Sequence, residues 1–142
     1  MKTKLKASLL GIMVVAALLQ TVQPDRSNPE VTAPLEAPPE VMAVLKRACY
    51  DCHSNETRWP WYSYLSPVSI LVANHVQEGR EHLNFSDWTT MDAAKQMHAS
   101  SEILEVLESG EMPLKSYLLL HGDAELSTAD KELLRSWAAQ GE

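Results

Sequence analysis

This sequence of 142 residues has no apolar run of 20 residues, no second cysteine pair and no alternating strand pattern. Without a second Cys-x-x-Cys the chain cannot form a four-thiolate zinc site. Basic residues are also few, since Lys2, Lys4 and Lys6 take three of the 12 and leave nine against 19 acidic residues. That negative charge excludes nucleic acid as an expected partner, because a phosphate backbone demands the opposite sign.

The N-terminus has the pattern of an export signal. Three lysines precede an uncharged run of 13 residues, Ala7 to Leu19, which form basic and apolar regions. As a helix this run is about 20 Å long against a hydrocarbon core of about 30 Å, although lysine side chains and Val22 lengthen it. No Ala-x-Ala cleavage site follows. We therefore predict that residues 1–22 stay as an anchor on the periplasmic face of the inner membrane; a cleaved, soluble periplasmic protein is the alternative.

A proline-rich segment follows the apolar run. Five of the eight prolines lie between Pro24 and Pro39. This density of proline prevents a packed helix or a central strand. Residues 23–39 are therefore predicted to be an extended linker, with about 3 Å of rise per residue, that holds the domain of residues 40–142 a few nanometres from the membrane.

The domain is predicted to be all-α, because its apolar residues recur at helical spacing. The first helix is expected at Pro39, with Val41, Val44, Leu45 and Ala48 on one face. A second is expected from Pro67, with an apolar face of Val68, Leu71, Val72, His75 and Val76. Later helices are expected around residues 88–97, from an N-cap at Ser101 to Gly110, and from a capping box that begins at Ser127.

Two thiols and one imidazole occur together at Cys49, Cys52 and His53. This Cys-x-x-Cys-His spacing is that of c-type haem attachment, in which each thiol forms a thioether and the histidine binds the iron. A redox dithiol and a zinc half-site are the alternatives. The zinc site lacks a fourth ligand. A thioredoxin-type dithiol is expected after a strand, whereas the residues before Cys49 are predicted to form a helix. Export agrees with this interpretation, because c-type haem is attached outside the cytoplasm.

A sixth ligand for the iron is predicted at Met112, between the helix end at Gly110 and the stiff Pro113. His75 is the main rival, although a histidine on an apolar helix face is more often a core residue. His82, His98 and His121 are expected at the surface. Trp59, Trp61 and Tyr62 are predicted to form a wall of the haem pocket. Arg58 and Arg80 are candidates either for haem carboxylates or for surface charges.

The order of helix, Cys-x-x-Cys-His, middle helices, Gly-x-Met-Pro and terminal helix resembles the cytochrome c superfamily. The chain is more closely similar to a bacterial family of haem-binding domain proteins, over about residues 20 to 141. The residues that carry this similarity are the attachment motif and residues 54–63, 78–80, 83–88, 110–113 and 117–121. The resemblance implies covalent haem binding and electron transfer. It indicates a fold and a cofactor, but it does not indicate a biological role.

The predicted function is that of a membrane-tethered, single-haem electron carrier. His53 and Met112 are its expected iron ligands, and an unidentified redox protein is its expected partner. The chain is not expected to be an enzyme. The alternative is a haem peroxidase or a haem-based sensor with an open or displaceable sixth ligand, and carbon monoxide binding would distinguish these functions from the carrier.

Overall fold

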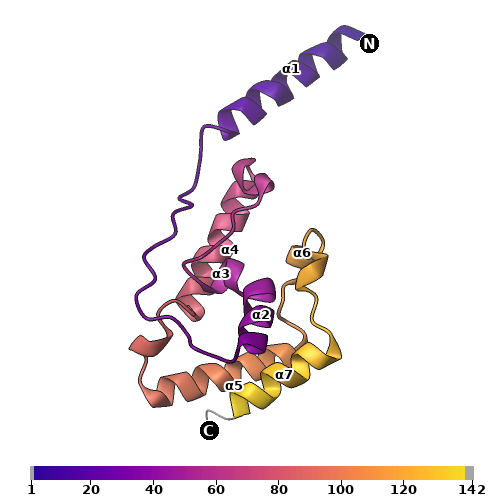
Figure 1. The fold of residues 1–142 in the computed structure, drawn as a ribbon. Helices are drawn as coiled ribbons and strands as arrows, with labels where there is room; N and C mark the ends of the chain where they lie inside the picture. Colours follow the sequence, from indigo (N-terminus) through magenta and orange to yellow (C-terminus); the bar gives the residue numbers. More distant parts are fainter. Residues whose placement is uncertain (1, 140–142) are drawn as a thin grey trace.

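A computed structural model describes residues 2–139, and all regular structure within them is helical (Figure 1). Seven α-helices and three short 3₁₀ helices follow one another along the chain, and no strand occurs in this range. The prediction of an all-α fold is confirmed. The elements are α1 (Lys2–Leu19), α2 (Pro39–Ala48), α3 (Tyr50–His53), η1 (Trp61–Tyr64), α4 (Val68–His82), η2 (Trp88–Thr90), α5 (Ala93–Ser109), α6 (Lys115–Leu118), η3 (Gly122–Ala124) and α7 (Thr128–Ala138).

Helix α1 contains the apolar N-terminal run and stands apart from the other helices (Figure 1). Its leucines, valines and methionine are all exposed, as is Val22 just beyond it. Among the helices of residues 2–139, none combines the length and the hydropathy of a bilayer-crossing span.

The proline-rich segment contains no helix or strand before α2 begins, and it lies along the domain. The backbone amides of Ala33 and Leu35 donate to the carbonyls of Ser86 and Phe85, at 3.1 and 2.8 Å. Nearer α1, the Asn28 side-chain amide donates to the Thr57 carbonyl at 3.0 Å. The residues between the prolines therefore form hydrogen bonds with the domain surface, and the segment follows that surface up to the start of α2.

The core lies where α2, α5 and α7 meet. Leu45, Phe85 and Leu134 are almost completely buried there. The predicted apolar face of α2 is confirmed, since Val41, Val44, Leu45 and Ala48 are all buried. Helix α3 packs against α2, and α4 packs against α3.

The apolar face predicted for α4 is wrong in part. Ser69, Ala73 and Val76 are its buried residues, whereas Val68 is 43% and Leu71 55% exposed. Small side chains face inward because α4 packs closely against α3, and a row of larger residues would separate the two helices. The consequence is that apolar side chains at the start of α4 face away from the body.

The region predicted as two helices after Trp88 contains the 3₁₀ turn η2 and one long helix, α5. Its N-cap is Asp92, whose side chain accepts a hydrogen bond from the Lys95 amide at 2.9 Å. Ser101, the predicted cap, lies inside this helix. The predicted end is confirmed, because Gly110 takes the left-handed conformation (φ 72°) that favours glycine after a helix. The capping box of α7 is also confirmed: Ser127 and Asp130 exchange hydrogen bonds.

Candidate functional site

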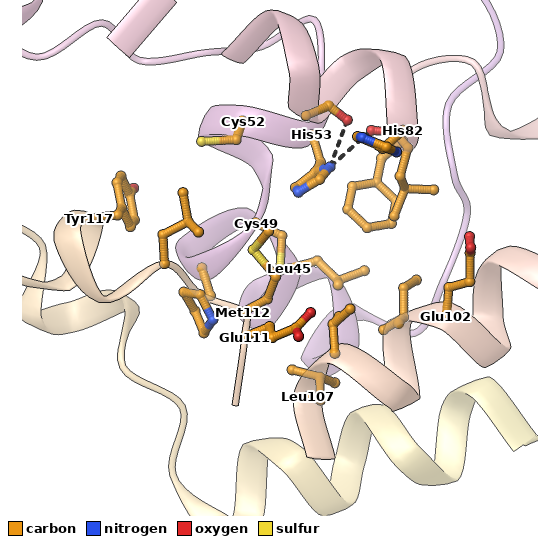
Figure 2. A pocket seen from close by; sticks show the side chains of 18 of the residues that line it. Leu45, Cys49, Cys52, His53, His82, Glu102, Leu107, Glu111, Met112 and Tyr117 are labelled. Carbon is orange, nitrogen blue, oxygen red and sulfur yellow. Dashed lines mark hydrogen bonds between the residues drawn. The ribbon is translucent and has the colours of Figure 1, made fainter. Parts of the chain in front are cut away.

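A cavity of about 610 Å³ opens between the α2–α3–α4 side of the molecule and the side formed by α5 and the loop after Gly110. Its volume lies within the range of small-molecule and cofactor sites. Cys49, Cys52, His53 and Met112 all line it (Figure 2). The remaining walls are largely apolar, with Leu45 and Phe85 among the residues that contribute. The predicted attachment and ligand residues therefore line one cavity.

The motif is positioned by α3, a single helical turn that directly follows α2. The amides of Cys52 and His53 both donate to the Cys49 carbonyl, at 3.1 and 2.9 Å. In a helical turn, residues three and four apart lie on the same side. The turn therefore presents the two thiols and the imidazole together to the cavity.

Two backbone carbonyls, one in α4 and one at the residue after it, hold the His53 ring. Its Nδ1 lies 2.9 Å from the Gly79 oxygen and 3.1 Å from the Leu83 oxygen. Because a carbonyl oxygen only accepts hydrogen bonds, Nδ1 carries the proton and Nε2 keeps its lone pair. Burial lowers the pKa of His53, which favours the neutral ring. A neutral imidazole with a free Nε2 and a fixed Nδ1–H is the form that binds a metal.

Gly79 lets these carbonyls approach His53. A Cβ atom at position 79 would lie 2.7 Å from the Cys52 carbonyl oxygen and 3.2 Å from the Cys52 Cβ. Real Cβ atoms essentially never come within 3.0 Å of another atom of this kind, so the 2.7 Å contact is not possible without movement. Glycine is therefore required for α4 to lie this close to α3.

The thiols do not have the properties of a reactive dithiol. Burial raises the pKa of Cys49 to about 12 and the pKa of Cys52 to about 11. A redox-active Cys-x-x-Cys needs a lowered thiol pKa, because the thiolate is the nucleophile. The structure thus gives no support to the dithiol alternative. For the zinc alternative, residues 2–139 contain no metal-holding group of three or more His, Cys, Asp or Glu side chains.

Met112 lies in the loop between α5 and α6, as predicted. The loop begins at Gly110, and the Met112 amide donates to the Val106 carbonyl at 3.2 Å, which ties it to the end of α5. The next residue, Pro113, also lines the cavity. Met112 therefore reaches the cavity from a loop whose backbone is bonded to the end of α5.

A carboxylate inside the attachment motif contacts Tyr117, one of the residues that line the cavity. Asp51 accepts a hydrogen bond from the Tyr117 hydroxyl at 2.8 Å, and it forms an ion pair with Arg58 at 3.2 Å. Burial raises the pKa of Tyr117, so its hydroxyl stays a donor. Tyr117 also stacks on His121 with ring centroids 4.0 Å apart. Sequence reasoning gave Asp51 no role, although a buried carboxylate in the motif indicates a fixed partner.

Other titratable side chains also reach the cavity. His75 and His82 line it, and so do four glutamates, Glu78, Glu102, Glu105 and Glu111. His82 is exposed, as expected, and also lines the cavity. His75 stays the rival of Met112. His98 is exposed as expected and lies 3.4 Å from Glu102.

Trp59, Trp61 and Tyr62, predicted as pocket wall, are not among the residues that line the cavity. Trp61 is 72% exposed, and Tyr62 instead contacts His121, with 3.5 Å between the hydroxyl and Nδ1. The buried Nε1 of Trp59 has no hydrogen-bond partner among the described residues. Their contact with haem remains a prediction.

The two candidate arginines have other partners in this structure. Arg58 pairs with Asp51. Arg80 donates to the carbonyls of Ser54 and Ser27 and to the side chains of Asn28 and Thr57, so it fastens the proline-rich segment to the domain.

An all-helical body, a cofactor-sized apolar cavity, an oriented imidazole and a cavity-facing thioether together define a protein built to hold a metal-containing ring such as haem. The chain belongs to the haem-binding domain family, because the sequence model of that family matches residues 11–140. The match begins within α1 and includes the proline-rich segment. Neither the curated proteins nor the solved structures that were searched contain a match to this chain.

Proposed function

We propose that this haem-binding domain carries single electrons through one haem, attached covalently at Cys49 and Cys52. The observation that supports it most strongly is the His53 ring, whose Nδ1 is bonded to the Gly79 and Leu83 carbonyls while Nε2 is left free in the same cavity as both thiols. When bound, haem supplies an iron that gains and loses one electron.

In this proposal the residues of the chain fix the haem and tune its iron. Cys49 and Cys52 would form the thioethers to the ring, and His53 would bind the iron. Met112 would supply a thioether ligand, which favours ferrous iron relative to a second imidazole. Leu45 and Phe85, which line the cavity, would make the surroundings of the ring apolar. Because the residues lining the cavity include no lysine or arginine in the described part of the chain, the haem carboxylates are expected to be hydrated.

The proposal includes attachment to the outer face of the inner membrane through the N-terminal segment. Helix α1 presents exposed apolar side chains along its whole length, and such a helix gains free energy by entering lipid. The three lysines at its start agree with a cytoplasmic location of that end of α1, because the cytoplasmic segments of membrane proteins carry an excess of Lys and Arg.

Absorption spectra of the purified protein, oxidised and reduced, with and without carbon monoxide, test the electron-carrier function. A carrier with Met112 on the iron is expected to show a low-spin spectrum in both states and to resist carbon monoxide. Ready binding of carbon monoxide by the wild-type protein would contradict the carrier and favour the peroxidase or sensor alternative.

A further inference from the structure

We propose that the exposed apolar side chains of η1 and the start of α4 form a second membrane contact, which rests on the lipid surface beside α1. This apolar patch consists of Trp61, Tyr64, Leu65, Val68 and Leu71, all of them exposed. The inference deepens the proposed membrane attachment and rests on it. It assigns the helical body itself, and not α1 alone, to the lipid interface.

Composition separates this region from the rest of the chain. Residues 59–77 contain no Asp, Glu, Lys or Arg, although 22% of the whole chain is charged. An acidic protein is repelled by an anionic bilayer, so a surface without carboxylates is the part that can approach one. Tryptophan and tyrosine, both present in the patch, are the residues enriched at the boundary between lipid and water.

The fold places this patch next to the end of α1. Gln20 accepts a hydrogen bond from the Ser66 amide at 3.1 Å, and its side-chain amide donates to the Tyr64 carbonyl. The Ser66 hydroxyl donates to the Val22 carbonyl at 2.9 Å. Figure 1 shows the start of α4 at the end of the helical body nearest to α1. Exposed apolar surface therefore continues from α1 onto the body.

One cation lies at the edge of the patch. The Arg26 guanidinium lies 4.4 Å from the centre of the Tyr64 ring and donates to the Ser63 carbonyl at 3.2 Å. A cation held at the level of an interfacial tyrosine is compatible with lipid phosphates. The apolar run of α1, about 20 Å long, is shorter than the hydrocarbon core, so a second contact would add to a weak first one.

The test measures partition of the full-length, haem-loaded protein onto vesicles of phosphatidylethanolamine and phosphatidylglycerol. The patch variant, Leu65→Ser with Leu71→Ser, is expected to bind at least about tenfold more weakly, equivalent to about 1.4 kcal/mol. The matched control is Val31→Ser with Met97→Ser, which removes two exposed apolar side chains from the proline-rich segment and from α5. It is expected to bind as the wild type does.

A second measurement locates the contact directly. Hydroxyl-radical labelling of Trp61 and Tyr64 is expected to fall when vesicles are added, while labelling of Met97 stays constant. Unchanged labelling of Trp61 and Tyr64 would overturn the inference. So would a patch variant that binds vesicles normally but loses self-association in sedimentation without lipid, because the patch would then contact a second copy of the chain.

A variant of α1, Val14→Gln with Leu18→Gln, separates this inference from the proposed attachment. If the α1 variant loses vesicle binding and the patch variant keeps it, the patch inference fails and the attachment through α1 stands. If both variants lose binding, both contacts are used; if the patch variant alone loses binding, attachment through α1 fails, and with it the inference of a second contact beside α1. The haem spectrum of each variant reports separately on the electron-carrier proposal.

Discussion

Replacing Gly79 with alanine should damage both the packing of α4 and the orientation of the proximal histidine. The added Cβ would lie 2.7 Å from the Cys52 oxygen, and an ordinary contact begins at 3.4 Å, so α4 must move away by about 0.7 Å. The same movement would lengthen the bond from His53 Nδ1 to the Gly79 oxygen from 2.9 Å to about 3.6 Å, which is no longer a hydrogen bond.

The expected magnitude follows from two opposing terms. Overpacking of this kind costs about 1 to 3 kcal/mol, and alanine in a helix recovers about 0.5 to 1 kcal/mol relative to glycine. We expect the free energy of unfolding of Gly79→Ala, from urea titration followed by circular dichroism, to fall by about 1 to 2 kcal/mol. The reduction potential should also rise, because an imidazole that has lost its Nδ1–H···O bond is a weaker donor to ferric iron.

The matched control is Gly122→Ala. A Cβ at Gly122 meets nothing within 4 Å, so this variant should be as stable as the wild type or slightly more stable, with an unchanged potential. If Gly79→Ala behaved like Gly122→Ala in both measurements, the close approach of α4 to α3 would not be what orients His53, and the reasoning would be refuted.

Two further predictions concern the sixth ligand and acid stability. Met112→Ala should abolish the weak far-red sulfur-to-iron band of the oxidised protein, open the iron to carbon monoxide and lower the potential; a band that persists, while His75→Ala changes the spin state, would make His75 the ligand instead. Hydrogen bonds from Ser127 lower the pKa of Asp130, so its contribution is present at neutral pH and is lost as pH falls below the ordinary value of 3.8. Asp130→Ala should therefore reduce the free energy of unfolding by about 0.5 to 1 kcal/mol at pH 7 and progressively less on acidification, and urea titrations that give a constant deficit down to pH 3 would contradict this.

Features that depend on neighbouring residues could be predicted from the sequence. The start of α2 at Pro39, the end of α5 at Gly110 and the capping box at Ser127 each rest on local chemistry, and the structure confirms all three. The attachment motif was equally local, because three residues in one turn face the same way. The position of Met112 in a loop that reaches the cavity followed from Gly110 and Pro113.

Features that depend on distant packing could not be predicted in the same way. The inward face of α4, Ser69, Ala73 and Val76, follows from its packing against α3 and η1, which lie elsewhere in the sequence. The two carbonyls that hold His53 belong to the backbone. Every residue has a backbone carbonyl, so the sequence does not show which ones will contact His53. Asp51 and Tyr117 are far apart in sequence, so only the fold shows that they form a hydrogen bond.

The central claim is that haem is joined to this chain by bonds that survive unfolding. The most direct test is the intact mass of the haem-loaded protein, measured by mass spectrometry after denaturation in acid and organic solvent. Covalent attachment at Cys49 and Cys52 predicts the mass of the polypeptide plus one haem, and loss of that added mass when both cysteines are replaced by alanine. A wild-type mass equal to that of the bare polypeptide would contradict the account.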